Sequence, residues 1–468
     1  MAGRLKNLFG TLDMTEGNPY SKLIRFSVPL LIGNFAQQLY NTVDSIIVGK
    51  YVGDGALAAV GASGPLLNLL LVLFIGISTG ANIMVAQYFG AKERQSLSKT
   101  VGTSITLTLL CSLFIMLFGP PIVRPFLSLV GTPDDIFEMT AAYLIIIFAG
   151  IIGMAFYNIL SGVLRGMGDS VMPLVFLIIA CGINIVLDLL FVAVFNWGVV
   201  GVAWATVIAQ LVSAVLCIVR VAFMRDTVDV NRKMLRPEKQ YVSQLVRLGL
   251  PSGASQAIFS TAAILVQNLT NTFGSFFIAC NTVVMRVDGF AVMPCFTFGN
   301  AMTSYVGQNI GAGRMDRVRD GTKACIKLAL AVSITLVVCI LCFGPNLMHL
   351  FTDTAELVAM GARQMRILAL GYIAMSITQT LSGAMRGAGD TVTPMWISVI
   401  TTIVIRMPLA YGLAYLTRSP ANPHGAWESI PGSLLIAWVI GATLNTILYK
   451  KGVWKKRARL PKENTASV

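Results

Sequence analysis

Long apolar segments recur along the whole chain and are separated by short polar stretches. Each is long enough to cross a hydrocarbon core of about 30 Å as a helix. The twelve predicted segments are residues 24–48, 57–85, 101–118, 141–160, 172–195, 199–223, 248–269, 275–304, 324–343, 368–381 (extended upstream), 392–416 and 434–449. Helices are expected instead of strands, because each backbone polar group must find its partner within its own segment. The pattern predicts an all-α polytopic membrane protein with twelve transmembrane helices.

Composition supports this class and excludes others. Of 468 residues, 55% are hydrophobic and 12% are charged, which is about half the charged fraction of a soluble domain. A soluble enzyme, a nucleic-acid-binding domain and a disulfide-rich secreted module are therefore excluded.

The distribution of basic residues predicts the orientation of the helices. The net charge is +14, from 35 Lys and Arg against 21 Asp and Glu. With both termini placed inside, 28 basic residues fall on the inner side and 5 on the outer side, while Arg286 and Arg406 lie within segments. This asymmetry is the positive-inside rule. We therefore expect a multi-pass protein of the cell membrane with both termini in the cytoplasm, and no nucleic-acid partner.

The chain contains an internal repeat. Residues 161–173 (SGVLRGMGDSVMP) recur 221 residues later as residues 382–394 (SGAMRGAGDTVTP). Six segments separate the copies, so both lie on the same membrane side and the repeats are parallel. We predict an N-terminal lobe (1–223), a polar cytoplasmic linker (224–244) and a C-terminal lobe (245–468), each lobe with six helices. In both copies we expect a tight turn, with Asp169 or Asp390 capping the following helix.

Ionisable residues inside membrane segments are costly and are candidates for function. The first segment carries Asp44 within a polar stripe that occupies an arc of about 120° and cannot face lipid. The stripe consists of Asn34, Gln37, Gln38, Asn41, Asp44 and Ser45. Pro29 precedes Asp44 by fifteen residues and removes one helical hydrogen bond. A static kink and a buried polar network are the structural alternative.

The fifth and sixth segments supply further oxygen atoms. Asn184 and Asp188 are four residues apart and share a helix face, and Thr206 lies in the next segment. Such a set suits an oxygen-ligand site for a small hard cation, or a proton-accepting carboxylate pair. Two neighbouring buried carboxylates without a cation are unfavourable. We therefore expect H⁺ or Na⁺ at Asp44, Asn184, Asp188 and Thr206, and no other cofactor.

The eighth segment carries a second polar set. Asn281 and Asp288 share a face, whereas Arg286 is only two residues from Asp288 and does not meet it along the helix. We expect Arg286 to pair with another helix, with a substrate role as the alternative; Arg406 has the same ambiguity. Polar residues that are candidates to line a cavity are Asn34, Gln37, Asn41, Asn281, Arg286 and Asp288.

The duplicated halves, the proline-bearing first helix and the paired Gln-x-x-Gly-Ala motifs at Gln87 and Gln308 resemble the multidrug and toxic compound extrusion (MATE) family. In the branch of that family with its cation site in the N-terminal lobe, the matching positions are Asp44, Asn184, Asp188 and Thr206. The resemblance also implies that Pro29 bends helix 1. The corresponding positions in the second half are the apolar Val266, Ile405 and Leu409.

The resemblance implies a cation-coupled antiporter that exports amphipathic, cationic organic compounds by alternating access. A lipid-linked oligosaccharide flippase of the same superfamily is the alternative, although only Arg286 and Arg406 are available within segments to bind pyrophosphate. An enzyme is disfavoured, because no nucleotide-binding loop, HExxH motif or serine nucleophile elbow is present. A structural partner would not explain the buried acids. Expected partners are a small organic substrate and membrane lipid; no nucleotide is expected, and we expect a monomer.

Overall fold

The computed structural model describes residues 10–458, except 230, 232, 350 and 421–422. These residues are mainly helical and include no β-strand. Some basic residues that were assigned to the inner side lie outside the described part of the chain. They are Arg4, Lys6, Arg232, Arg459 and Lys462.

The chain forms two compact units. Unit 1 contains the described residues up to Asp13 together with Val28–Gly253, and unit 2 contains Met14–Ser27 and the described residues from Ala254 onward. The division differs from the predicted lobes, because two stretches change place: residues 14–27 belong to unit 2, and residues 245–253 belong to unit 1.

Close helix packing explains the second exchange. A Cβ atom added to Gly76 would lie 2.8 Å from the carbonyl oxygen of Gly249, and one added to Gly80 would lie 2.8 Å from that of Leu245. Small residues therefore let the first turns of α10 pack closely against α4 in unit 1. Hydropathy does not report such contacts.

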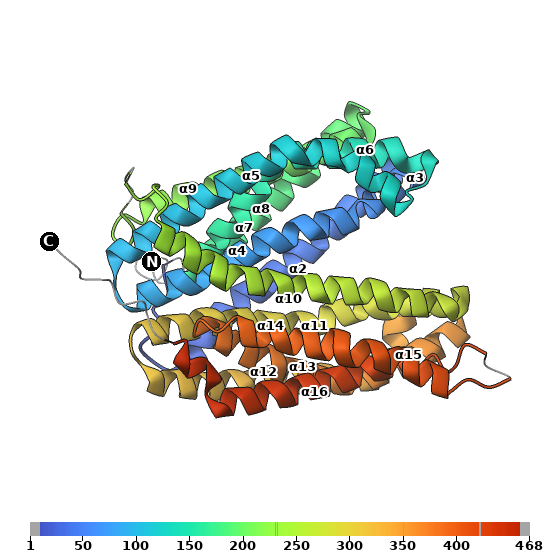
Figure 1. The fold of residues 1–468 in the computed structure, drawn as a ribbon. Helices are drawn as coiled ribbons and strands as arrows, with labels where there is room; N and C mark the ends of the chain where they lie inside the picture. The colour runs from blue at the N-terminus through green and yellow to red at the C-terminus, as the bar shows by residue number, and fades with distance from the viewer. Residues whose placement is uncertain (1–9, 230, 232, 350, 421–422, 459–468) are drawn as a thin grey trace. The chain divides into compact units, whose positions relative to one another are not determined.

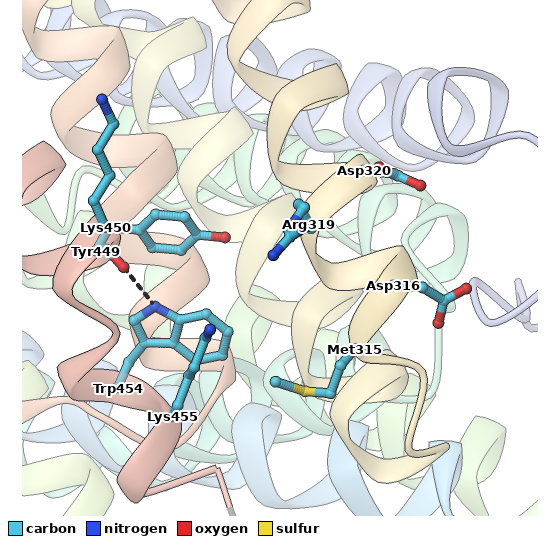
Figure 2. Close-up of a pocket in the computed structure, with 8 residues that line it drawn as sticks. All are labelled: Met315, Asp316, Arg319, Asp320, Tyr449, Lys450, Trp454 and Lys455. Atoms are coloured by element: carbon cyan, nitrogen blue, oxygen red, sulfur yellow. Dashed lines mark hydrogen bonds between the residues drawn. The ribbon is translucent and has the colours of Figure 1, made fainter.

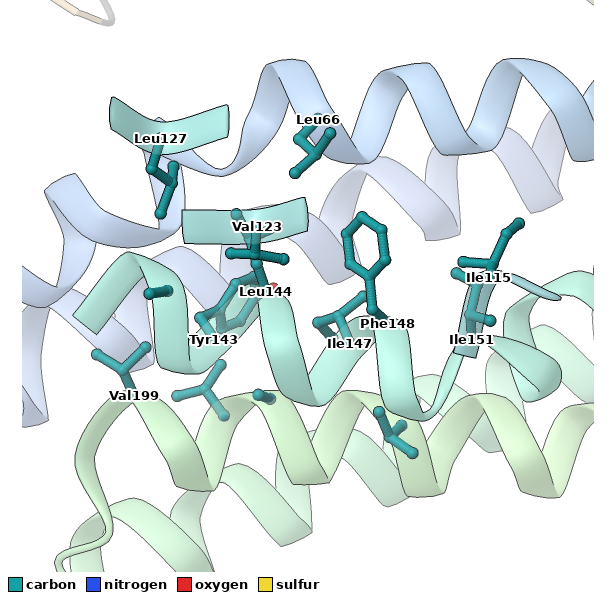
Figure 3. Packing of buried hydrophobic residues seen from close by; sticks show 14 of the residues in the cluster. Leu66, Ile115, Val123, Leu127, Tyr143, Leu144, Ile147, Phe148, Ile151 and Val199 are labelled. Carbon is teal, nitrogen blue, oxygen red and sulfur yellow. The ribbon is translucent and has the colours of Figure 1, made fainter. Parts of the chain in front are cut away.

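Unit 1 is built from the first half of the helices (Figure 1). They are α2 (Pro19–Tyr51, from Val28), α3 (Asp54–Ala62), α4 (Gly64–Gly90), α5 (Arg94–Val130), α6 (Asp134–Ala149), α7 (Ile151–Gly166), α8 (Val171–Asp188), the π-helix η1 (Leu189–Val194), α9 (Gly198–Phe223) and the start of α10 (Lys239–Thr272). A core of aliphatic and aromatic side chains joins α4, α5, α6, α7 and α9, including Val123, Leu144, Ile147 and Phe148 (Figure 3).

Unit 2 repeats this plan. Its helices are the rest of α10, α11 (Gly274–Gly311), α12 (Met315–His349), α13 (Ala355–Gly387), α14 (Val392–Val399), the π-helix η2 (Ile400–Arg406), α15 (Met407–Leu416), α16 (Ser429–Lys451) and the 3₁₀ turn η3 (Val453–Lys456). Helix α13 packs against α11, α12 and α16.

The predicted twelve spans are confirmed in the described residues. Ten helical stretches are long and apolar enough to cross a membrane, and the α6–α7 pair makes an eleventh. Helix α2, with 33 residues, is long enough to be the twelfth and also carries charged residues and the polar stripe. Large apolar side chains face outward, as lipid contact requires: Leu117 on α5, for example, is 68% exposed.

Three spans differ from the prediction in detail. The segment predicted at 141–160 is a pair of helices, α6 and α7, bent by 54°. The break falls at Gly150, where a Cβ would lie 2.4 Å from Val207, so glycine allows α9 to approach. Helix α5 extends well beyond 101–118, and α13 extends upstream of 368–381, as predicted, and also downstream to Gly387, because a helix continues through polar or proline-bearing ends that hydropathy discounts.

The duplicated motif joins helices and caps them. Asp169 Oδ1 accepts a hydrogen bond from the Met172 N–H at 3.1 Å, and Asp390 Oδ1 accepts one from the Thr393 N–H at 3.1 Å. The predicted caps are therefore confirmed. Each buried carboxylate also has an arginine partner: Arg220 Nη2 lies 2.8 Å from Asp169, and Arg457 Nη1 lies 2.6 Å from Asp390.

Loss of one arginine from these pairs should destabilise its unit. In Arg220→Gln the fully buried Asp169 carboxylate keeps its backbone bond but loses its counter-charge. Removing one partner of such a pair costs about 3 kcal/mol. We expect a lower unfolding temperature of the detergent-solubilised protein, and recovery in Arg220→Gln with Asp169→Asn, because asparagine keeps the cap without a charge. If Arg220→Gln alone were as stable as the unmodified chain, the ion pair would not stabilise the unit.

Candidate functional site

Two carboxylates meet inside unit 1. Asp44 on α2 and Asp188 on α8 interact directly through their side chains. Asp188 is fully buried and Asp44 is partly buried. Among the described residues neither forms an ion pair with a basic side chain. The structure thus brings together the two acids that the sequence placed four segments apart.

Asn184 and Thr206 complete the predicted set. When the Asn184 amide is oriented to satisfy both neighbours, Nδ2 donates to Asp188 Oδ2 at 2.9 Å and Oδ1 accepts from the Thr206 backbone N–H at 3.3 Å. Asn184 is fully buried, and Thr206 is almost so. The amide therefore holds Asp188 in position and ties α8 to α9.

One oxygen of each acid remains without a partner. Asp44 Oδ1 and Asp188 Oδ1 are buried and accept no hydrogen bond from the described residues. Buried polar atoms normally find partners, so each acid has one oxygen that could accept a further donor. A donor set made only of oxygen atoms suits a hard cation. Since the Asn184 oxygen faces a backbone N–H, the two carboxylates are the principal ligands available to such an ion.

Two tyrosines belong to this cluster and were not predicted. Tyr40 lies one turn before Asp44 and hydrogen-bonds to Thr206 through its side chain. Tyr143 of α6 is 5% exposed and lies near both acids. Figure 3 shows Tyr143 within the apolar core of the unit. The i,i+4 spacing to Asp44 was a signal for Tyr40, whereas nothing in the apolar segment around Tyr143 singled it out.

Local backbone structure places the site near one end of the unit. Asp188 is the last α-helical residue before the π-helix η1 (Leu189–Val194), and such π-helical turns are frequent at functional sites. Asp44 lies seven residues before the end of α2. Both acids are thus about two turns from the end of the unit opposite to the duplicated motif.

A small cavity adjoins the cluster on the α7 and α9 side. Its volume is about 10 Å³, and Thr206 and Gln210 are among the residues that line it. Gln210 Oε1 is buried without a hydrogen-bond partner among the described residues. A cavity of this size has room for about one water molecule.

The remaining polar residues of α2 lie outside the cluster. Asn41 is exposed, and Asn34 and Gln37 are partly exposed. These three residues therefore follow an open face of the helix. Pro29 lies inside α2, as predicted.

The polar residues of α11 in unit 2 form separate contacts. Asn281 Oδ1 accepts a hydrogen bond from Gln364 Nε2 at 2.7 Å. Asp288 Oδ1 accepts one from the Tyr372 hydroxyl at 2.8 Å. Arg286 is exposed and forms no ion pair with any described residue, so the predicted pairing with another helix is not observed.

Asp288 shares a cavity of about 220 Å³ with Arg406. The two charges lie beyond ion-pair distance, and Arg406 Nε is buried without a partner in the described structure. The positions equivalent to the unit 1 cluster are apolar in unit 2, so the repeat is structural and the carboxylate pair occurs in one half.

The fold defines a polytopic α-helical membrane protein with a pair of buried acids in one of its two units. The sequence profile of the MatE family matches residues 29–190 and again residues 251–412. The chain therefore belongs to the MATE family of transporters.

Similar proteins cover nearly the whole chain. A probable multidrug resistance protein of Bacillus subtilis, YoeA, is 29% identical over 96% of both chains. The probable multidrug resistance protein NorM of Thermotoga maritima is 26% identical over 96% of both. A solved structure of a multidrug resistance MATE family transporter in an outward-facing conformation is 25% identical and has a TM-score of 0.86, covering 96% of this chain and all of the other.

Proposed function

We propose that this chain is a secondary active antiporter that exports amphipathic, cationic organic compounds in exchange for H⁺ or Na⁺. The observation that carries the proposal is the direct contact of Asp44 and Asp188 without a counter-charge from the described residues. In a low-dielectric interior the doubly charged pair is unfavourable. Arrival of one cation relieves that repulsion and departure restores it. Relatives named as multidrug resistance proteins support organic compounds as the cargo.

The proposed orientation follows the basic residues. Both termini lie in the cytoplasm of a cell-membrane protein that acts as a monomer, and the carboxylate pair is nearer the outer side. The coupling ion thus enters from outside and the organic cation leaves outward. The membrane potential supplies about 2.3 kcal/mol per 100 mV for each net elementary charge that moves inward in a cycle, and nothing when one monovalent cation is exchanged for another. A tenfold ion gradient adds about 1.4 kcal/mol.

Reconstitution tests both the transport and the ion. We expect protein in liposomes to transport ethidium against its concentration gradient when either a pH gradient or a Na⁺ gradient is imposed alone. The gradient that drives this transport identifies the coupling ion. Protein-free liposomes and collapse of the gradient with an ionophore are the controls. Failure of both gradients would refute the antiporter, and movement of a lipid-linked oligosaccharide in the same liposomes would favour the flippase.

A further inference from the structure

A third cavity lies at the end of unit 2 where α12 begins and α16 ends. Its volume is about 590 Å³, a size typical of ligand sites. Residues from α12, α16 and η3 line it (Figure 2). They are Met315, Asp316, Arg319, Asp320, Tyr449, Lys450, Trp454 and Lys455.

One wall of the cavity is aromatic and held in place. Trp454 is buried and stacks on Tyr449, with ring centroids 5.4 Å apart and planes inclined by 16°. Trp454 Nε1 donates to the Tyr449 carbonyl oxygen at 3.1 Å, and the Tyr449 hydroxyl lies 3.1 Å from Thr322 Oγ1 on α12. The wall therefore joins the two helices and exists without a ligand.

The side chains that face this wall are cationic. Lys455 Nζ lies 5.9 Å from the centre of the Trp454 ring. Figure 2 shows Arg319 extending from α12 toward Tyr449, while the carboxylates of Asp316 and Asp320, which also line the cavity, point away from Tyr449 and Trp454. The Asp316 carboxylate is also neutralised by Arg314, at 3.0 Å. Among the charged residues that line the cavity, the basic Arg319, Lys450 and Lys455 outnumber the acidic Asp316 and Asp320, so the cavity favours an anion.

The surroundings distinguish a lipid from a soluble anion. Exposed residues of α16 follow one helix face toward the cavity, at spacings of three and four residues. They are Ile436, Val439, Thr443, Ile447 and Lys450. This face is mainly apolar over the membrane length and ends at a lysine on the cavity. Tryptophan and basic residues at span ends mark the membrane interface.

We propose that this cavity binds the phosphate headgroup of an anionic phospholipid from the leaflet at this end of the unit. The phosphate lies between Arg319 and Lys455, and an acyl chain follows Ile447 and Val439 along α16. Basic pockets between membrane helices bind such headgroups. The site lies in unit 2 and does not depend on the carboxylate pair of unit 1.

Native mass spectrometry of the full chain tests the site. Phosphatidylglycerol and phosphatidylcholine with the same acyl chains are titrated separately. We expect phosphatidylglycerol to bind more tightly, and Arg319→Gln with Lys450→Gln and Lys455→Gln to weaken it by at least about tenfold. The matched control is Lys323→Gln with Lys451→Gln and Lys456→Gln, which removes three exposed charges that do not line the cavity. The control should bind as the unmodified chain does.

Equal loss in the two triple variants would overturn the proposal, because it would show a general effect of net charge. Unchanged binding in the cavity variant would also overturn it. A second measurement uses the single variant Arg319→Gln, which removes only one charge. Phosphatidylglycerol with brominated chains should quench Trp454 fluorescence less in this variant than in the unmodified chain. Trp454→Phe is the blank. Inorganic phosphate or glycerol 3-phosphate that binds as tightly as the lipid would assign the cavity to soluble phosphates and refute a lipid site.

Discussion

Asp44→Asn is expected to reduce ion-driven ethidium export to the level of protein-free liposomes, with normal amounts of folded protein in the membrane. Asparagine has nearly the same shape but cannot carry the charge that alternates as the ion binds and leaves. Its amide can also donate to Asp188, which would hold the cluster permanently in the ion-occupied arrangement. The measurement is ethidium efflux under each imposed gradient, normalised to reconstituted protein.

Asp54→Asn is the matched control, since Asp54 is exposed on α3 outside the cluster. It should transport normally, whereas Asp188→Asn should behave as Asp44→Asn does. Full export by Asp44→Asn at normal protein levels would remove this acid from the coupling mechanism and would refute the assignment of the site.

Gly383→Ala is expected to cause a large loss of folded protein. A Cβ at Gly383 would lie 2.2 Å from the carbonyl oxygen of Gly299, and both atoms belong to packed helices, α13 and α11. The backbones must separate, and overpacking of this kind costs about 1–3 kcal/mol or more. The measurement is the unfolding temperature and the monodisperse fraction in detergent.

The control for this variant is Gly412→Ala on α15, where nothing lies within 4 Å of the added Cβ. It should be neutral or slightly stabilising, because alanine favours a helix. If Gly383→Ala matched Gly412→Ala in stability, the close contact of α11 and α13 would not be present in the membrane protein.

The sequence predicted those parts of the site that obey helical spacing. Asn184 and Asp188 were found because they are four residues apart, and Asp44 was found because ionisable residues are rare in apolar segments. Tyr143 gave no such signal, because an aromatic residue in a membrane helix is ordinary. The surroundings of Asp288 were also hidden. Tyr372, which donates to it, and Arg406, which lines the same cavity, are more than eighty residues away in the chain, and only packing brings them near.

The doubled motif was only partly understood from its sequence. Its aspartates were predicted as caps, which the structure confirms. Its glycines also allow close packing of neighbouring helices, because a Cβ at any of them would overlap atoms of the adjacent helix. They are Gly162 and Gly166 in the first copy and Gly383 and Gly387 in the second. That role depends on which helices are adjacent, so hydropathy and turn rules do not report it.

Two long helices, α2 and α10, pass from one unit to the other, and each contains a proline within two residues of the passage, at Pro29 and Pro251. From Pro29 to Asp44 the helix is a rod of about 22 Å. A change of about 10° at the proline therefore displaces the far carboxylate by about 4 Å, which is enough to take Asp44 out of reach of Asp188. We therefore expect the angle of α2 at Pro29 and the ion occupancy of Asp44 to depend on each other.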